Sequence, residues 1–319
     1  MKPIAGVIIN AGSGRGNGKG LALHRRLEGS ANIHLHLLGD FTALTRVLVQ
    51  FASVGVSDLY ISSGDGTIQA IQTLAAEQSL FKELPRLCLL PHGTTNLTGI
   101  DVGFKISSVS KQAEYIRRGV VNCVAKRHSL RVLNPRGTGP RHGMTLGAGA
   151  AATATRLAQF THNDQGRTGQ LAAFAVMASG FAKSIFAKPN HQDTARLDRP
   201  CPMTITSAGR VIADGPQLMF IATTLERQFF NARPFWGGKH GPIRASIFPY
   251  PAPNPLRWLV PLMYGGEDRK VPPGAASFSG NAFEIECEEP FVLDGEFFDG
   301  PTHGPLRVEA GPEFEFILG

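Results

Sequence analysis

The stretch from Leu59 to Thr67 reads LYISSGDGT, an apolar run that ends in a small, polar turn containing two glycines. A helix-like segment from Ile68 to Ala76 follows directly. Glycine lets the backbone approach a ligand closely, and the unpaired N–H groups of a helix N-terminus attract phosphate. Asp65 in such a turn would repel phosphate unless it handles a metal ion or a proton. The stretch therefore predicts a strand, a turn and a helix, and it favours phosphoryl transfer, although Gly-Asp-Gly also occurs in plain turns.

Three further segments repeat this pattern of an apolar run followed by a polar turn. Residues 6–9 lead to Asn10 and a glycine-rich loop at 11–16, and residues 87–90 lead to the turn PHGTTN at 91–96. Far downstream, residues 291–293 lead to Asp294-Gly295-Glu296, where Asp-Gly is also a strong hairpin signal. Ligands of open α/β sheets bind outside the carboxyl ends of the strands. We therefore expect the three turns in the first hundred residues to line one crevice.

The order of the predicted elements divides the chain in two. Strands at 4–10, 32–38, 58–62 and 86–90 alternate with helices at 17–28, 41–53, 67–77 and 107–118. This alternation predicts an α/β N-terminal domain with a Rossmann-like parallel sheet. From residue 123 onward, short β-rich runs alternate with Gly- and Pro-rich turns, which predicts a β-rich sandwich domain interrupted by a helix at 167–187. We expect domains at 1–122 and 123–319, with the active site in the cleft between them.

Composition narrows the partners and the compartment. The 319 residues are 42% hydrophobic and 18% charged, as in ordinary globular proteins. The net charge of +7 comes from scattered basic residues without a long basic run or interleaved aromatics, so we do not expect nucleic-acid binding. The four cysteines are far apart in the sequence, and Met1-Lys2-Pro3 runs straight into the first strand without a signal peptide. The apolar stretch at 171–187 is too short and too interrupted for a membrane span. These features predict a cytoplasmic protein.

Two nucleotide-binding motifs can be excluded. A Walker A motif needs glycine five residues before its Gly-Lys pair and Ser or Thr after it, but Ser13 and Gly20 occupy those places around Gly18-Lys19. The same loop does not contain the Gly-x-Gly-x-x-Gly fingerprint of dinucleotide binding.

The four turns together resemble the motif set of the diacylglycerol kinase catalytic-domain family, which includes bacterial lipid kinases, sphingosine kinases and ceramide kinases. NAD kinase belongs to the wider superfamily. The matching elements are Asn10-x-x-Ser13-Gly14, Ser63-Gly64-Asp65-Gly66-Thr67, Pro91-x-Gly93-Thr94-x-Asn96 and Asp294-Gly295-Glu296. The resemblance implies an ATP-dependent lipid kinase that phosphorylates the hydroxyl of diacylglycerol, ceramide or a sphingoid base. The alternatives are a small-molecule kinase of the NAD kinase type and a catalytically inactive protein that binds lipid or nucleotide.

The resemblance also assigns roles to residues and implies ATP and Mg²⁺ as cofactors. The residues that it places at the nucleotide are Asn10, Ser13, Gly14, Ser63, Gly64, Asp65, Gly66, Thr67, Gly93, Thr94 and Asn96. The catalytic residues that it implies are Asp294, Glu296 and Asp65. We favour Asp294 as general base, with Glu296 assisting at the metal or the ribose. In sphingosine kinases the aspartate that matches Asp65 has been given the role of base, and the sequence does not choose between these assignments.

The chain departs from the family pattern at three places. One is Leu97-Thr98, where the family commonly has an acidic residue and an aromatic residue. Ser63 replaces the first glycine of the Gly-Gly-Asp turn, as it does in sphingosine kinases. Bacterial diacylglycerol kinases carry an aspartate-rich turn that binds a structural Mg²⁺, whereas the matching residues here, Gly237–Gly241, include no carboxylate. We therefore expect Mg²⁺ with ATP only. The expected partner is a lipid substrate at an anionic membrane surface, bound peripherally and reversibly. The oligomeric state stays open, a homodimer included.

Overall fold

We analysed a computed structural model of the chain, which describes residues 3–13, 16–92, 97–134, 139–165, 196–228, 231–252, 254–301 and 303–319. The helix predicted at 167–187 lies outside these residues. The chain forms two compact units: the first comprises Met1–Ser129 and Gly311–Gly319, and the second comprises Leu130–Ala310.

The first unit is built on a parallel sheet. Its elements are β1 (Ile4–Asn10), α1 (Gly18–Leu27), β2 (Ile33–Leu38), the short 3-10 helix η1 (Phe41–Ala43), α2 (Leu44–Ser53), β3 (Val56–Ser62), α3 (Asp65–Glu77), β4 (Arg86–Leu89), α4 (Leu97–Val102), α5 (Val109–Arg118), the start of β5 (Val124–Leu133) and the end of β17 (Leu306–Ile317). The strand order in this unit is β17–β4–β3–β1–β2, and all of these neighbours are parallel. The alternation of strands and helices predicted from the sequence is confirmed.

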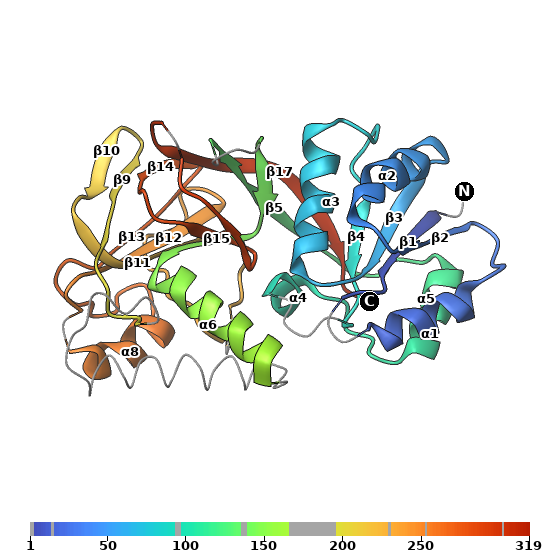
Figure 1. Ribbon diagram of the computed structural model, residues 1–319, viewed down its shortest axis with the longest axis horizontal. Helices are drawn as coiled ribbons and strands as arrows, with labels where there is room; N and C mark the ends of the chain where they lie inside the picture. Colours follow the sequence, from blue (N-terminus) through green and yellow to red (C-terminus); the bar gives the residue numbers. More distant parts are fainter. Residues whose placement is uncertain are drawn as a thin grey trace. The chain divides into compact units, whose positions relative to one another are not determined.

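Helices cover both faces of this sheet, because successive residues of a strand point to opposite sides. Val7 and Ile9 of β1 are buried together with Leu23 of α1. Gly6 faces the other side, where an added Cβ would lie 2.6 Å from Cδ2 of Phe51 on α2. Figure 1 shows α2 and α3 on one face of the sheet and α1 and α5 on the other. The missing side chain at Gly6 thus lets α2 pack closely on β1.

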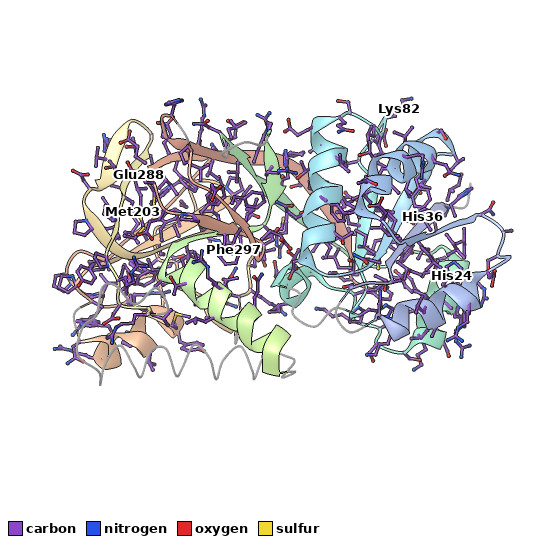
Figure 2. The ribbon with its side chains drawn as sticks, in the orientation of Figure 1. His24, His36, Lys82, Met203, Glu288 and Phe297 are labelled. Atoms are coloured by element: carbon purple, nitrogen blue, oxygen red, sulfur yellow. The ribbon has the colours of Figure 1, made fainter. Side chains whose placement is uncertain are left out.

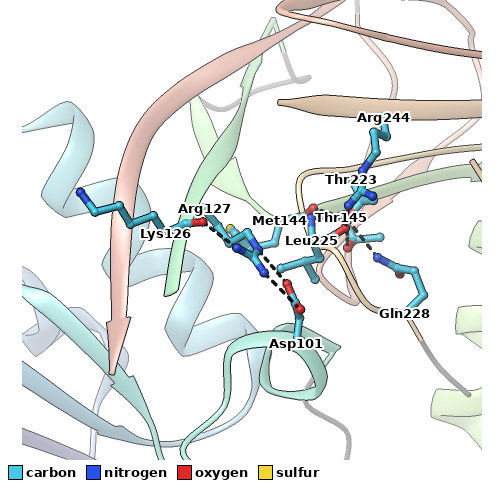
Figure 3. Close-up of polar contacts among 9 residues, drawn as sticks. All are labelled: Asp101, Lys126, Arg127, Met144, Thr145, Thr223, Leu225, Gln228 and Arg244. Atoms are coloured by element: carbon cyan, nitrogen blue, oxygen red, sulfur yellow. Dashed lines mark hydrogen bonds and ion pairs between the residues drawn. The ribbon is translucent and has the colours of Figure 1, made fainter. Parts of the chain in front are cut away.

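The short helix α4 is an element that the sequence analysis did not predict. Asp101 near its end is buried and accepts a hydrogen bond of 2.9 Å from Nε of Arg127 on β5 (Figure 3). The pair therefore connects α4 to β5 within the first unit. Removing one partner of such a buried pair typically costs about 3–5 kcal/mol, because the remaining charge is left without a counter-charge.

The second unit is an antiparallel β-sandwich. Its further elements are β6 (Arg141–Gly143), β7 (Thr145–Gly149), α6 (Ala150–Gln165), β8 (Cys201–Pro202), β9 (Thr204–Ser207), β10 (Arg210–Ala213), β11 (Pro216–Thr223), β12 (Ile243–Pro249), α8 (Pro255–Tyr264), β13 (Ala276–Gly280), β14 (Ala282–Glu286), β15 (Phe291–Leu293) and β16 (Glu296–Phe298). One sheet has the order β10–β9–β14–β17, and the other has the order β13–β12–β11–β7–β15–β16. Phe220 of β11 and Phe283 of β14 meet edge to face with ring centres 5.3 Å apart, so the core lies between the two sheets.

The last strand, β17, contributes residues to both units. The order of elements in the sequence predicts a second domain that runs to residue 319, but Gly311–Gly319 belongs to the first unit. There Phe316 pairs in parallel with Leu87 of β4, and the side chains of Phe314 and Phe316 are fully buried. An alternating β pattern indicates a strand without indicating its partner, which is why the sequence did not reveal this return.

The described helices of the second unit are α6 and α8. Figure 2 shows Phe297 of β16 beside α6, and the guanidinium carbon of Arg156 on α6 lies 5.2 Å from the centre of its ring. Within the described part of the chain, no helix has the length and apolar character that crossing a membrane requires.

Two cysteines that are far apart in the sequence come together in the second unit. The Sγ atoms of Cys201 on β8 and Cys287, just after β14, lie 3.5 Å apart as free thiols. Cys201 is buried and Cys287 is half-buried.

Candidate active site

The predicted nucleotide-binding residues of the first unit gather where β1 and β3 end. Asn10 donates from Nδ2 to Oγ1 of Thr67 over 3.2 Å, and the hydroxyl of Ser63 donates to the same atom over 2.6 Å. Ser13 lies beside Gly64, because its Oγ would be 3.6 Å from a Cβ placed there. The parallel arrangement of the strands thus brings Asn10, Ser13, Ser63, Gly64 and Thr67 together.

Helix α3 begins directly after this turn. Gly64 is its N-cap with φ −85° and ψ 177°, a conformation that any residue can adopt, so the backbone does not require glycine here. What glycine provides at this position is the absence of a side chain near the first N–H groups of the helix. Those groups have no partner within the helix, and the helix dipole attracts anions to them. Asp65 and Gly66 occupy the first turn of α3, and both are half-buried.

Four of the predicted nucleotide-binding residues, Gly14, Gly93, Thr94 and Asn96, lie outside the described residues. Their assignment stays a prediction.

Asn17 is a residue of this region that was not among the predicted site residues; it is the N-cap of α1 and is buried. Its Oδ1 accepts from the N–H of Gly20 over 3.0 Å. Its Nδ2 donates to the carbonyl oxygens of Asn10 and Ser62, each over 2.9 Å. Asn17 therefore joins the end of β1 to the end of β3. An asparagine just before a helix is a recognised N-cap signal, so the sequence did contain a sign of this residue.

Asp294 of the second unit sits in a two-residue hairpin between β15 and β16, with positive φ at Asp294 (49°) and at Gly295 (88°). The side chain of Asp294 is only 2% exposed. Its carboxylate accepts hydrogen bonds from the N–H groups of Met144, at 2.9 and 3.0 Å, and of Thr145, at 2.8 Å. Burial raises the pKa of Asp294 to about 7, while these hydrogen bonds act in the opposite direction. Asp294 thus anchors the hairpin to the start of β7.

Met144 and Thr145, whose N–H groups bind Asp294, are hydrogen-bonded in turn to Thr223 of β11. Figure 3 shows Thr223, whose hydroxyl donates to the carbonyl oxygen of Met144 over 2.8 Å and lies 3.0 Å from the hydroxyl of Thr145. Nε2 of Gln228 donates to the same Thr223 hydroxyl over 3.2 Å. This network fixes the two N–H groups that face the Asp294 carboxylate.

Glu296 occupies a different environment from Asp294, although the two residues flank the same glycine. Glu296 begins β16 and is exposed. On the other side of the turn, Nε2 of Gln159 on α6 donates to the carbonyl oxygen of Gly295 over 2.7 Å. The hairpin is therefore held from two sides, and Glu296 is its solvent-accessible carboxylate.

The segment Gly237–Gly241 is attached to β13 by hydroxyl groups. Ser277 accepts from the N–H of Gly237 over 3.1 Å, and Ser279 accepts from the N–H of His240 over 2.8 Å. A Cβ at Gly237 would lie 2.3 Å from Cα of Phe278, so this close approach of two backbones requires glycine. Among the described residues, no group of three or more His, Cys, Asp or Glu side chains is arranged to hold a metal ion.

A comparison with known protein families finds a match within the first unit. Residues 5–128 match the sequence model of the diacylglycerol kinase catalytic domain. This match confirms the resemblance inferred from the motifs for the part of the chain that it covers, which holds the first three of them. No curated protein matches the sequence.

Solved structures support the fold over the whole chain. The structure of a diacylglycerol kinase from Bacillus anthracis strain Sterne is similar with a TM-score of 0.60 and 16% identity, and the likeness covers 100% of this chain and 97% of that chain. A second structure from the same organism, named only provisionally as a diacylglycerol kinase, has a TM-score of 0.64 at 15% identity with the same coverage. At this level of identity the likeness establishes the fold alone. The predicted α/β domain followed by a β-rich domain is confirmed.

Proposed function

We propose that the protein is an ATP-dependent lipid kinase that transfers the γ-phosphoryl group to the hydroxyl of a lipid acceptor, namely diacylglycerol, ceramide or a sphingoid base. The observation that carries this proposal is the meeting of Asn10, Ser13, Ser63 and Thr67 at the N-terminus of α3, within the segment that matches a kinase domain. Phosphoryl transfer depends mainly on positioning and on electrostatic stabilisation, and this cluster offers both.

The polar groups at the ends of β1 and β3 suit a triphosphate. The N–H groups in the first turn of α3 and the hydroxyl of Ser13 are hydrogen-bond donors at the positive end of a helix dipole. Removing one preorganised donor from a transition-state site typically costs about 3–4 kcal/mol. The half-buried carboxylate of Asp65 is an oxygen ligand of the kind that Mg²⁺ prefers, so it fits the ion that accompanies ATP. That ion would neutralise charge on the phosphates.

A base must remove the proton of the acceptor hydroxyl. The surroundings of Asp294 and Glu296 differ in how well each carboxylate could reach that hydroxyl. The sequence analysis favoured Asp294, with Glu296 assisting. The carboxylate of Asp294 is 2% exposed and already accepts hydrogen bonds from two backbone N–H groups. A base must come within about 3 Å of the hydroxyl, or one water away. The side chain of Glu296 is exposed, and this favours Glu296 as the proton acceptor, while Asp294 holds the hairpin in place.

Substitutions separate this assignment from the alternative base Asp65. Glu296→Gln should lower kcat by about 100-fold or more, the typical worth of general-base catalysis, and leave the affinity for ATP unchanged. Asp65→Asn should weaken the binding of Mg·ATP as well as lower kcat. The matched control is Glu286→Gln, because Glu286 is an exposed glutamate at the end of β14. Normal turnover in Glu296→Gln together with a pure kcat loss in Asp65→Asn would assign the base to Asp65.

The central experiment follows label from γ-labelled ATP into a total lipid extract presented as vesicles. A labelled product in the organic phase supports the lipid kinase, and chromatography of that phase identifies the acceptor lipid. A labelled product in the aqueous phase instead supports a small-molecule kinase of the NAD kinase type. Binding of ATP without any labelled product supports an inactive nucleotide-binding protein.

We also propose that the protein docks reversibly on anionic membranes, since a lipid kinase must reach its substrate there. The net charge of +7 supports this, because each engaged basic residue contributes about 1 kcal/mol near an anionic surface. On α8, Val260 and Tyr264 are 64% and 56% exposed, which offers an apolar contact beside Arg257. Co-sedimentation with phosphatidylserine vesicles should fall steeply as salt rises. Binding that salt does not change would assign the attachment to apolar insertion, and absence of binding would contradict the proposal.

A further inference from the structure

A chain of side-chain hydrogen bonds crosses the first unit from α1 to α5. Nδ2 of Asn17 donates to Oγ of Ser62 over 2.9 Å, and Oγ of Ser62 lies 2.8 Å from Nδ1 of His92. Nε2 of His92 lies 2.9 Å from Oε1 of Gln112. The four residues come from four separate places: the N-cap of α1, the end of β3, the turn after β4, and α5. We call this chain the His92 relay.

The directions of the bonds in the His92 relay follow from its Gln112 end when the imidazole ring is neutral. Nε2 of Gln112 donates to the carbonyl oxygen of Ile106 over 2.8 Å, so Oε1 must be the acceptor that faces His92. Nε2 of His92 therefore carries the proton, and its Nδ1 is an acceptor. Ser62 consequently donates to Nδ1 rather than to Oδ1 of Asn17, which lies 3.2 Å away. One Nδ2 hydrogen of Asn17 is then shared between Oγ and the carbonyl oxygen of Ser62. The relay fixes one tautomer of His92 and gives each group one role.

Burial makes these bonds difficult to replace with water. Ser62 and Gln112 are 0% exposed, and Asn17 is 7% exposed. Burial lowers the pKa of His92, the hydrogen bond that its ring donates to Gln112 acts in the opposite direction, and the positive charge of Lys19 adds a smaller lowering. His92 is thus a neutral ring whose two nitrogens are both engaged. A buried group that loses its partner bears its full desolvation penalty.

The relay ends among the predicted nucleotide-binding residues. Ser62 immediately precedes Ser63, and His92 immediately precedes Gly93. Asn17 also donates to the carbonyl oxygen of Asn10, whose own Nδ2 donates to Thr67. The backbone of β4 is joined to β3 in the same region, because the N–H of Leu90 donates to the carbonyl oxygen of Ile61 over 2.9 Å.

We propose that His92 is a positioning residue of the nucleotide site, which acts through Ser62 and Asn17 to set the ends of β1 and β3 against the turn after β4. This inference rests on the proposed function. Misplacement of a catalytic group by about 1 Å can cost about 100-fold in rate, so a side chain that touches no substrate can control binding and turnover. The part of the relay that matters is the Nδ1 side, because it leads to Asn10 and Thr67.

Two substitutions of His92 separate the two sides of its ring. The amide of His92→Asn can occupy the place of Nδ1 and accept from Ser62, whereas the longer amide of His92→Gln can reach Gln112 instead. We expect His92→Ala and His92→Gln to weaken binding of a non-hydrolysable ATP analogue by about tenfold or more, which is the worth of one buried hydrogen bond left unmade. His92→Asn should retain affinity close to that of the wild type. Ordinary structural destabilisation would not distinguish Asn from Gln in this way.

A double-mutant cycle with Ser62→Ala completes the test. If Ser62 and His92 act as one relay, the double variant Ser62→Ala/His92→Ala should bind the analogue no more weakly than the worse single variant. Calorimetric titration gives the affinities, and circular dichroism confirms that each variant is folded.

The outcomes distinguish this inference from the proposed function. Equal affinity of wild type, His92→Ala and His92→Gln would overturn the role of His92 while leaving the proposed function intact. Multiplicative losses in the double variant, or equal losses in His92→Asn and His92→Gln, would also overturn the relay. Absence of nucleotide binding by the wild-type protein would overturn the proposed function and, with it, this inference.

Discussion

The Asn17→Gly variant should lose about 3 kcal/mol of stability in the first unit. The substitution removes the Nδ2 group, whose two hydrogens are donated to Asn10 and Ser62, and it removes Oδ1, which accepts from the N–H of Gly20. Three buried hydrogen bonds at about 1 kcal/mol each give this magnitude. Glycine is the right replacement because Asn17 has φ 29°, a conformation that alanine would adopt only with strain.

Asn32→Gly is the matched control. Asn32 also has positive φ, at 59°, but it is exposed, and no hydrogen bond of its side chain is found among the described residues. Both substitutions therefore add the same freedom to the unfolded chain, and only the first removes buried contacts. The difference between the two variants isolates the hydrogen bonds of Asn17.

The assay must observe the first unit directly. Both tryptophans, Trp236 and Trp258, lie in the second unit, so tryptophan fluorescence does not follow the first unit. Amide hydrogen exchange along a urea gradient, resolved by mass spectrometry, reports β1, α1 and β3 separately and uses the second unit as an internal reference. A difference of less than about 1 kcal/mol between the two variants would refute the reasoning, because it would fall to the worth of one hydrogen bond.

Three further predictions concern other parts of the molecule. Folding raises the pKa of Asp294 from 3.8 to about 7, so the stability that this residue contributes is present below about pH 4 and is lost as the pH rises to about 7. Urea unfolding followed by tryptophan fluorescence should therefore show that the wild type loses about 4 kcal/mol of stability relative to Asp294→Asn over this pH range. A gain in relative stability with rising pH would contradict this prediction. Gly6→Val should destabilise the first unit by about 1–3 kcal/mol through overpacking against Phe51, and hydrogen exchange should show a smaller cost of the same substitution when it is made in a Phe51→Ala background. Oxidised glutathione should link Cys201 to Cys287 by thiol–disulfide exchange, releasing two reduced glutathione molecules, and peptide mapping without reductant should find the linked pair.

Local sequence patterns were sufficient to predict most of the helices and strands of the first unit. The apolar run at 59–61 and the polar turn after it marked the end of β3 and the start of α3, and the structure places this boundary between Ser62 and Asp65. Helix α4 gave no comparable signal, because six residues are too few to show helical periodicity. In the second half, alternation predicted strands, while the short strands β6 and β16, three residues each, were below what a period of two can reveal.

One part of the candidate site could likewise be predicted from the sequence, and another part could not. The gathering of Asn10, Ser63 and Thr67 followed from the rule that parallel strands end at one edge of a sheet. The burial of Asp294 could not be predicted, because its partners Met144 and Thr145 are about 150 residues away in the sequence. A local Asp-Gly pair predicts the hairpin, and only the packing of β7 against it decides what the carboxylate contacts.

The path of β17 has a consequence for how the protein is made. A ribosome finishes residues 1–129 well before it reaches Gly311, so the emerging first unit lacks the strand that pairs with β4. Until then the sheet has an open edge, and the places later filled by Phe314 and Phe316 are unoccupied. Exposed strand edges and apolar surface are what chaperones recognise in nascent chains. The whole of the second unit must be synthesised before the parallel sheet of the first unit can close, so the two halves are expected to mature together.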